Sequence, residues 1–390
     1  MRTVPWLILI CLVGAAVPAK AGCIWIGDHP ATIRQEIESA DAAVLAKWVS
    51  AKRRHPSVVD NDHQGQPGQT TYKVLEVVKD AKETVKNKKE VIVEQYLTGK
   101  PRDFVLVVSS DNSKLRWQKP IPVTRGRFDY IKAVAALDGQ RDLEFYLDYL
   151  EDSDAAVAQD AFLEFEMAPF EDVKLISKKL PRDKLRRWIK AKNTKETRRR
   201  LYGEMLGLCG TDEDAEFMAE MIRKQVKDFR AIDGVMSGYL LLKGEEGLKL
   251  LEDTKLKADV NAPFPEKYAA MLALEFAWSE VRTIERNRLK ESMRLVLQCP
   301  EFADLAVRKL ARWKDWEVQD QVLALYDRKD YDVPAIKRSI VRYLLSSIKD
   351  SKDDAEQNPE KHAAMAKIHL ETLRKKDPKT VQQAERFYFD

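Results

Sequence analysis

The spacing of hydrophobic residues changes once along the chain, near residue 124. Between Cys23 and Thr124, apolar residues come in short bursts rich in β-branched side chains, separated by polar loops that contain glycine or proline. Such bursts predict β-strands, here at Ala42–Val49, Thr70–Val78, Glu90–Gln95 and Phe104–Val108. Four or five short strands in a segment of roughly 100 residues indicate a small barrel or sandwich.

From Arg125 onward, apolar residues recur every three or four positions, which is the spacing of amphipathic helices. Examples are the sets Leu201, Met205 and Leu208; Val235, Tyr239 and Leu242; and Leu289, Met293 and Val296. No further strand is predicted. The fold class expected from both patterns is α+β, with a small β-domain followed by an all-helical part.

The helical part contains a degenerate repeat. Leu206–Gly210 (LGLCG) recurs 34 residues later as Leu240–Gly244 (LLLKG), each time at the end of an apolar helix and before an acidic helix start. Thr211 followed by Asp214 fits a helix capping box. Paired helices with a period of roughly 34 to 47 residues are typical of a HEAT-like or armadillo-like α-solenoid, in which neighbouring pairs stack to bury their apolar faces.

The first 21 residues have the features of a signal peptide. Arg2 provides a positive start, Trp6–Val17 is an apolar core, and Ala19, Lys20 and Ala21 fit the small-x-small cleavage rule. We therefore expect an exported, periplasmic or extracellular protein without a transmembrane segment, since no later stretch reaches the roughly 20 apolar residues of a span. Cys23 lies just behind the cleavage point, so a lipoprotein anchored at Cys23 is the alternative, although Lys20 does not suit a lipidation signal.

Charge and cysteine content exclude several classes. Removing residues 1–21 deletes two of the 67 basic residues and leaves 65 against 63 acidic ones, a net charge of +2. Such a balance does not attract nucleic acid, and export also argues against a nucleic-acid partner. Of the cysteines, Cys23, Cys209 and Cys299 remain, which is no disulfide framework. Cys209 and Cys299 lie in apolar helical patterns and are predicted to pack as small hydrophobic side chains.

Several segments resemble known families. The amino-terminal part, with SADAAVLAKWVSAK, TTYKVLEVVKD and GKPRDFVLVV, resembles the netrin-like domain shared with metalloprotease inhibitors, an OB-fold barrel. The mature chain is similar to a group of exported bacterial proteins that join such a domain to HEAT-like helical repeats, on AFLEFEMAPFEDV, RRRLYGEMLGLCG, GYLLLKGEEGL and LARWKDW. In the inhibitors an amino-terminal cysteine chelates the protease zinc, but here Gly22 precedes Cys23 and the barrel has no second cysteine. The resemblance thus implies a fold and no activity.

The strongest local charge anomaly is a basic block. Residues 178–200 contain 12 basic and two acidic residues, whereas residues 138–172 contain 12 acidic residues and a single arginine. One interpretation is a docking patch for an anionic glycan, lipid headgroup or acidic protein, with Trp188 as a stacking face. Its residues are Arg186, Arg187, Trp188, Lys190, Arg198, Arg199 and Arg200. The other interpretation, which we favour, is that neighbouring repeats carry opposite charges that match.

No catalytic or metal-binding constellation is recognised. The segment Gly234–Gly238 (GVMSG) is one residue out of register with a serine elbow and lies in a helical pattern. The loop His55–Gly68 imitates the start of an EF-hand but has Thr71 where the bidentate glutamate belongs. His362 and His369 share one face of a predicted helix, which alone is no metal signature. We therefore expect neither cofactor nor metal.

These observations predict four regions: a signal peptide (residues 1–21), a netrin-like or OB-fold β-barrel (22–124), a HEAT-like α-solenoid (125–349), and a polar hinge with C-terminal helices (350–390). The function that fits best is a non-catalytic interaction or scaffold protein that binds a protein or an anionic envelope polymer through its helical surface. The alternatives are a hydrolase that acts on envelope material through carboxylates that the sequence does not locate, and a lipid-anchored envelope scaffold.

Overall fold

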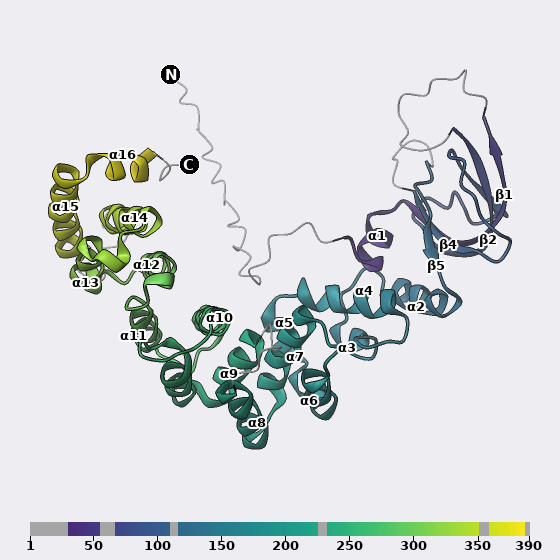
Figure 1. Ribbon diagram of the computed structural model, residues 1–390. Helices are drawn as coiled ribbons and strands as arrows, with labels where there is room; N and C mark the ends of the chain where they lie inside the picture. The colour runs from purple at the N-terminus through teal and green to yellow at the C-terminus, as the bar shows by residue number, and fades with distance from the viewer. Residues whose placement is uncertain (1–29, 55–66, 110–115, 225–231, 351–358, 387–390) are drawn as a thin grey trace, which may run out of the picture. The chain divides into compact units, whose positions relative to one another are not determined.

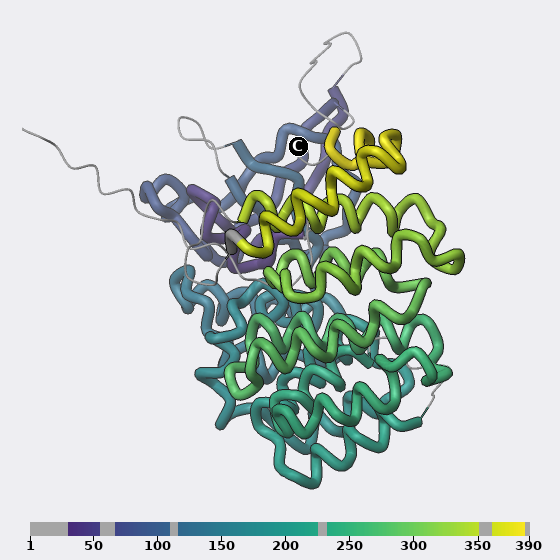
Figure 2. Tube along the Cα trace, turned by 90° about the vertical axis from the view of Figure 1, so that its left-hand side faces the viewer, coloured from purple at the N-terminus to yellow at the C-terminus, as the bar shows by residue number. Residues whose placement is uncertain are grey.

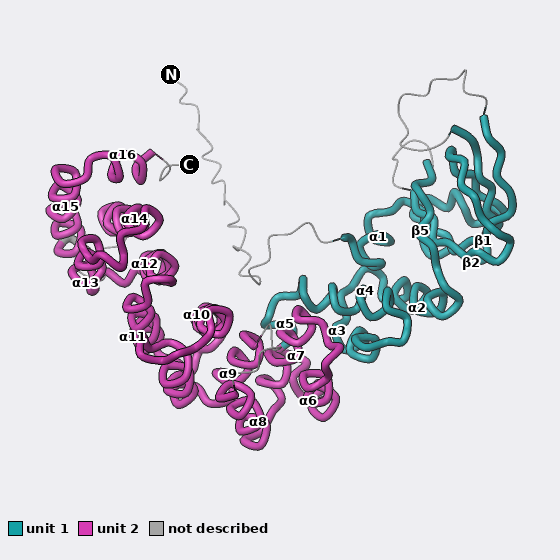
Figure 3. Tube along the Cα trace, in the orientation of Figure 1, with its two compact units in different colours: residues 1–173 teal, residues 174–390 magenta. Residues whose placement is uncertain are grey.

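The computed structural model describes residues 30–54, 67–109, 116–224, 232–350 and 359–386. Two compact units divide the chain between Val173 and Lys174 (Figures 1 and 3). This division does not coincide with the change in hydrophobic spacing near residue 124. The helices that directly follow the strands belong to the first unit, together with the sheet.

The first unit contains one antiparallel sheet of five strands in the order β3-β2-β1-β4-β5. The strands are β1 (Ala42–Arg53), β2 (Gly68–Asp80), β3 (Glu90–Val93), β4 (Phe104–Ser109) and β5 (Ile121–Val123). The four predicted strands are confirmed, and β5 is an additional short edge strand. The prediction of a small β-rich region before residue 124 is therefore correct as to element type.

Alternating side chains of the sheet form a hydrophobic core on one face. Ala42, Val44 and Ala46 of β1 pack with Val105 and Val107 of β4, as the period of two in a strand requires. The intervening residues of β1 are also buried, so the centre of the sheet is covered on both faces. Central strands buried on both faces are near-continuous apolar runs.

Helices of the first unit pack beside the sheet. They are α1 (Ile33–Ser39), α2 (Arg125–Ala136), α3 (Leu143–Leu147) and α4 (Ala155–Glu166), while α5 (Phe170–Leu175) spans the division between the units. Lys79 of β2 donates hydrogen bonds to the carbonyls of Ile37 and Glu38 in α1, and Lys132 of α2 pairs with Glu76 of β2 at 3.0 Å. These contacts attach α1 and α2 to the sheet.

The second unit is helical throughout its described residues. Its α-helices are α6 (Arg182–Lys190), α7 (Glu196–Cys209), α8 (Asp212–Arg223), α9 (Asp233–Leu251), α10 (Phe264–Glu280), α11 (Arg286–Val296), α12 (Ala303–Arg312), α13 (Gln319–Ala324), α14 (Pro334–Asp350), α15 (Pro359–Lys376) and α16 (Pro378–Arg386). Within this unit each helix packs mainly against helices close to it in the chain, as Figures 1 and 2 show. The predicted helical patterns around residues 205, 239 and 293 lie in α7, α9 and α11.

The glycines at the ends of the two repeated segments lie where the helical backbone stops or breaks. Gly210 is the C-cap of α7, and Gly244 has a φ of 55° that breaks the helical backbone within α9. A positive φ is readily adopted only by glycine, which explains this residue type at position 244. Thr211 and Asp214 form the predicted capping box at the start of α8.

Helices α7 and α9 approach each other closely through glycines. A Cβ atom on Gly203 or Gly207 of α7 would lie within 2.4–2.5 Å of the backbone of Gly234 or Gly238 in α9. Small residues four positions apart on both helices allow this contact between backbones. The segment Gly234–Gly238 is therefore a helix-packing motif, with Ser237 buried inside α9.

Candidate anion-binding site

The basic block at residues 178–200 extends over α6 and the start of α7, and several of its arginines pair with carboxylates further along the chain. Arg182 and Arg186 contact Asp214 of α8, at 2.5 and 3.4 Å, and Arg200 pairs with Asp233 of α9. Both aspartates are buried. The partners of these arginines thus lie in α8 and α9, after the block and not in the acidic stretch at residues 138–172.

Acidic residues of that stretch have arginine partners in the first unit. Arg127 pairs with Asp154 at 2.8 Å, and Arg34 and Arg141 pair with Glu164 at 3.0 and 2.9 Å. Opposite charges do match between neighbouring elements, but the pairs named here join each block to residues outside the other: Arg182 and Asp214 are 32 positions apart in the chain, and Arg34 and Glu164 are 130 positions apart.

Three further members of the predicted patch are used inside the fold. Arg198 and Arg199 are buried, and Arg199 donates hydrogen bonds to the carbonyls of Ile189, Ala191 and Thr194 at 3.2 Å each. Trp188 packs on Tyr202 with ring centroids 5.0 Å apart, so that one side of its ring is occupied.

Arg187 and Lys190 are the members of the predicted patch that remain exposed on α6. The Nζ of Lys190 lies 4.8 Å from the ring centroid of Phe217 in α8, a cation–π distance. The structure therefore does not bring the seven predicted residues together on one exposed surface. It presents a smaller cationic face on α6, with Lys184 also exposed.

The cysteines and histidines considered in the sequence analysis lie in separate parts of the chain. Cys23 and the loop at residues 55–66 lie outside the described residues. Cys299 is buried, and its Sγ lies 3.2 Å from the Nζ of buried Lys267, while Cys209 is half-buried. Burial raises the pKa of the Cys209 thiol to about 11, which keeps it protonated at neutral pH. His369 of α15 pairs with Asp320 at 3.1 Å.

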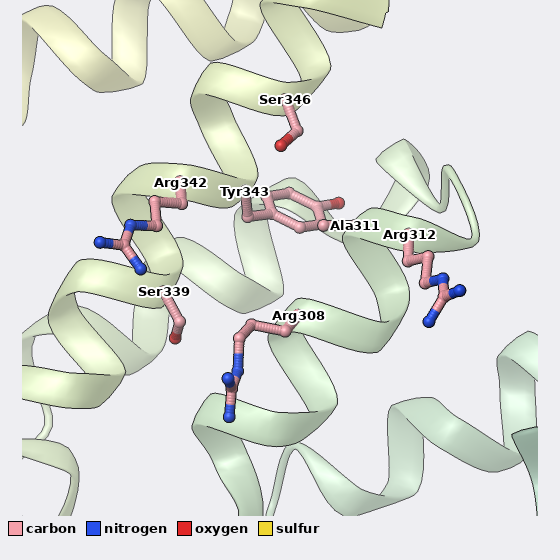
Figure 4. Close-up of a pocket in the computed structure, with 7 residues that line it drawn as sticks. All are labelled: Arg308, Ala311, Arg312, Ser339, Arg342, Tyr343 and Ser346. Atoms are coloured by element: carbon pink, nitrogen blue, oxygen red, sulfur yellow. The ribbon is translucent and has the colours of Figure 1, made fainter. Parts of the chain in front are cut away.

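A cavity lined by arginines lies between α12 and α14 and was not predicted from the sequence. Its volume is about 260 Å³. Helix α12 contributes Arg308, Ala311 and Arg312, and α14 contributes Ser339, Arg342, Tyr343 and Ser346 (Figure 4). On α12 the second and third lining residues follow the first by three and four positions, and on α14 the others follow Ser339 by three, four and seven, so the lining residues of each helix share one face.

The cavity has an excess of positive charge. Arg308 pairs with Asp304 one turn earlier in α12, at 3.1 Å, and Arg342 donates a hydrogen bond to the carbonyl of Ala384 at 3.5 Å. Within the described part of the chain, Arg312 has no ion-pair partner and neither does Arg342. Three guanidinium groups are therefore opposed by the single carboxylate of Asp304, and Arg308 and Arg312 are exposed to solvent.

The side of the cavity formed by Tyr343 is rigid. Tyr343 is fully buried, and its hydroxyl donates a hydrogen bond to the carbonyl of Asp315. The carboxylate of Asp315 accepts two hydrogen bonds from Arg294, at 2.8 and 2.6 Å. A bidentate arginine–carboxylate pair holds its geometry well, so the buried Tyr343 ring is fixed in place behind the polar side chains that line the cavity.

A second cavity, of about 630 Å³, lies in the first unit. It is lined by Thr124, Gly126, Asp129, Tyr130, Tyr149, Asp152, Ser153, Asp154 and Val157. Asp154 is the N-cap of α4, and its hydrogen bonds from Arg127 and Thr124 hold its pKa well below the ordinary value. Asp154 is thus an ionised structural group, which leaves Asp129 and Asp152 as the exposed and half-buried carboxylates of this cavity.

Buried carboxylates of α4 also form a network that joins α4 to the segment before the sheet. Glu164, which is fully buried, accepts hydrogen bonds from Thr32 and Arg34, and Asp160 accepts one from Tyr130 at 2.6 Å. Burial raises the pKa of Asp160 to about 6. Because these groups are enclosed and hydrogen-bonded, we assign the network a structural role.

Among the residues that the structure describes, no three His, Cys, Asp or Glu side chains gather in a way that could hold a metal ion. No helix in the same ranges is both long and apolar enough to cross a membrane. Comparisons with protein-family models, curated proteins and solved structures find no match to this chain.

Proposed function

We propose that the chain is an exported, non-catalytic binding protein that recognises an anionic partner through its helical second unit. The site is the arginine-lined cavity between α12 and α14, and the partner is an anionic polymer or an acidic protein of the cell envelope. The observation that carries this proposal is the set Arg308, Arg312 and Arg342 around one cavity, opposed by the carboxylate of Asp304 alone.

The packing of the helices supports a solenoid architecture. Helices of the second unit pack on helices one or two places away in the chain, as α7 does on α9 and α12 on α14, which is expected for stacked helix pairs of the HEAT type. The antiparallel sheet of the first unit, in the order β3-β2-β1-β4-β5, has the five strands expected of an OB-fold barrel. Folds of both types occur in binding proteins that present extended surfaces to partners.

The arginine composition of the cavity favours an anion over other ligands. Guanidinium groups remain charged at any physiological pH and donate paired hydrogen bonds to the oxygens of carboxylates, sulfates and phosphates. Ser339 and Ser346 add hydroxyl groups to the lining. An apolar ligand would leave these donors without partners, which is energetically costly.

Salt-dependent adsorption of the full mature chain to immobilised heparin, a sulfated polysaccharide, tests the proposal. We expect binding at low salt and earlier elution of the triple variant Arg308→Gln, Arg312→Gln, Arg342→Gln. The matched control is Lys184→Gln, Arg187→Gln, Lys190→Gln, which removes three exposed cations from α6 and should elute close to the wild-type protein. Flow-through of the wild-type chain at low salt, or a loss confined to the α6 variant, would refute the proposed site.

The cavity of the first unit favours one alternative function, hydrolysis of envelope material. Asp129 and Asp152 line a space large enough for a sugar or peptide unit. Paired carboxylates are the usual acid and base or nucleophile of glycoside hydrolysis. Product release from cell-wall oligosaccharides that is lost in Asp129→Asn and Asp152→Asn would establish this activity, and its absence with the wild-type chain would exclude it for those substrates.

Lipid anchoring at Cys23 is a separate proposal about location. Mass spectrometry of the mature amino terminus distinguishes a free chain that starts after Ala21 from one that carries a diacylglycerol-modified Cys23. Either form leaves the helical second unit free to bind its partner.

A further inference from the structure

We propose that the cavity between α12 and α14 is a site for a phosphomonoester group. This inference rests on the proposed function, because it specifies the chemical class of the anion that the same cavity binds. It is argued from the number of guanidinium groups, the hydroxyl groups beside them and the volume of the cavity.

The charges of the cavity match a dianion. Arg308 and Arg342, on the same side of the Tyr343 ring as Ser339, contribute the two positive charges that can contact the ligand. Arg312, on the other side of the ring, adds a third charge to the field of the cavity and offsets the negative charge of Asp304. A phosphomonoester carries a charge of about −1.5 to −2 at pH 7, since its second pKa is about 6. A carboxylate or a sulfate ester carries a single charge and would leave part of the positive excess uncompensated.

The donors of the cavity suit a group with three terminal oxygens. Figure 4 shows the hydroxyl of Ser339 between the side chains of Arg308 and Arg342, with Arg312 on the opposite side of the Tyr343 ring. Two guanidinium forks and a hydroxyl can therefore address different oxygens of one phosphate. Arginine is the residue that best matches phosphate geometry, because its fork donates two parallel hydrogen bonds.

The existing contacts of these donors leave capacity for a ligand. Ser339 is buried and its hydroxyl donates to the carbonyl of Ile336 at 2.7 Å, so it donates to a phosphate oxygen only by rotating away from that carbonyl. Arg342 uses its Nε for the Ala384 carbonyl, which leaves its two terminal nitrogens available. Arg308 uses its Nε for the Asp304 carbonyl and its Nη2 for the Asp304 carboxylate, so its Nη1 is available, and a more highly charged ligand can displace the exposed ion pair.

The volume sets the size of what accompanies the phosphate. A cavity of about 260 Å³ is slightly smaller than typical small-molecule sites, which begin at about 300 Å³. It can hold a phosphate group with a small attached unit, such as part of a sugar or a glycerol. The same phosphate chemistry could come from a free sugar phosphate or from the phosphorylated end of an envelope polymer.

Isothermal titration calorimetry of the full mature chain with glucose 6-phosphate tests this inference, with glucose 6-sulfate as the control ligand. We expect the phosphate to bind more tightly at pH 7.5 than at pH 5, because it gains its second charge between these values. Binding of the sulfate should be weaker and should not increase over that range. Equal affinities for the two ligands at pH 7.5 would overturn the phosphate assignment.

Variants then locate the bound group. Arg342→Gln should weaken phosphate binding by about tenfold to hundredfold, the range expected for losing charge-assisted hydrogen bonds. Arg342→Lys should give an intermediate loss, since it keeps the charge and removes the fork. Arg187→Gln, on exposed α6, is the matched control and should bind like the wild-type chain. Far-UV circular dichroism of each variant confirms that its helices are intact, and unchanged phosphate binding by folded Arg342→Gln would refute the site.

Competition experiments identify the source of the phosphate, and the heparin assay tests the proposed function independently of phosphate binding. Binding of glucose 6-phosphate supports a small soluble ligand or a polymer end, and competition by a polymer that carries a terminal phosphomonoester, lost when a phosphatase removes that group, would identify the polymer end. Heparin adsorption that depends on the three arginines, together with no phosphate binding, would overturn this inference and leave the proposed function standing. Loss of both would overturn both.

Discussion

The close approach of α7 and α9 makes a strong prediction about Gly238. A Cβ atom added there would lie 2.1 Å from the carbonyl oxygen of Gly203 and 3.0 Å from the Cε of Met218. The first of these atoms is backbone, so no change of side-chain rotamer can relieve the overlap. In Gly238→Ala, the two helices must therefore move apart.

The magnitude follows from two opposing effects. Alanine in place of glycine favours an isolated helix by about 1 kcal/mol. Overpacking costs about 1–3 kcal/mol, and a clash with backbone belongs at the upper end of that range. The expected net loss is about 2 kcal/mol, which for a unit of this size lowers the midpoint of thermal unfolding by roughly 4–8 °C.

Thermal unfolding followed by circular dichroism at 222 nm measures this loss, because the second unit dominates the helical signal. Gly126→Ala is the control: it also places alanine in a helix, α2, but its Cβ would have no neighbour within 4 Å. We expect Gly126→Ala to unfold at an equal or higher temperature than the wild-type chain. An unchanged or raised midpoint for Gly238→Ala would refute the assignment of Gly203, Gly207, Gly234 and Gly238 as the packing surface of the two helices.

Three further predictions concern buried or capping charges. Burial raises the pKa of Glu204 to about 8, so the folded state keeps a proton that the unfolded state releases above about pH 4.5. The free energy of unfolding is therefore greatest below about pH 4.5. It falls by up to about 1.4 kcal/mol per pH unit as pH rises towards 8. Urea denaturation at pH 5 and pH 7.5 should show this fall in the wild-type chain and a smaller one in Glu204→Gln, and an identical fall in both would exclude Glu204 as its source. Arg294→Ala leaves the buried carboxylate of Asp315 without its two arginine hydrogen bonds and should cost about 3–5 kcal/mol in the same assay, whereas a cost below about 1 kcal/mol would contradict the buried-pair account. Asp154→Ala removes the N-cap of α4 and should lower the free energy of unfolding by about 1–2 kcal/mol at pH 7. The loss should become smaller as pH falls below 3.8, because the unfolded wild-type chain then binds a proton at Asp154 that the folded chain, with its lowered pKa, does not; equal losses at both pH values would argue against an ionised cap.

The sequence did not predict which arginines line the candidate site. The block at residues 178–200 is conspicuous because its charges are consecutive, yet Arg198 and Arg199 are buried and Arg200 is paired with Asp233. Arg308 and Arg312 lie one helical turn apart, but Arg342 follows Arg312 by 30 positions, so the sequence does not indicate that the three arginines line one cavity. One signal was present: Ser339, Arg342, Tyr343 and Ser346 follow the spacing of a single helix face. That spacing does not say which helix lies opposite.

The amino-acid sequence by itself determined the type of most elements. Short bursts of apolar and β-branched residues at Ala42–Val49 and Thr70–Val78 specify strands because such side chains pack well on a pleated, buried surface. Recurrence every three or four residues specifies α7, α9 and α11 because side chains at that spacing lie on one face of a helix, and the Thr211–Asp214 capping box marks the start of α8.

Only the tertiary structure decided which charges are enclosed and which remain available. Arg200 and Arg342 are the same residue type on amphipathic helices, but packing places Asp233 beside the first and an open cavity beside the second. It also decided that α2, α3 and α4 belong with the sheet, and that Gly203 meets Gly238. These outcomes depend on contacts between residues about 30 or more positions apart. Because the periodicity of apolar residues reflects local backbone geometry, it gives information only about neighbours within one element.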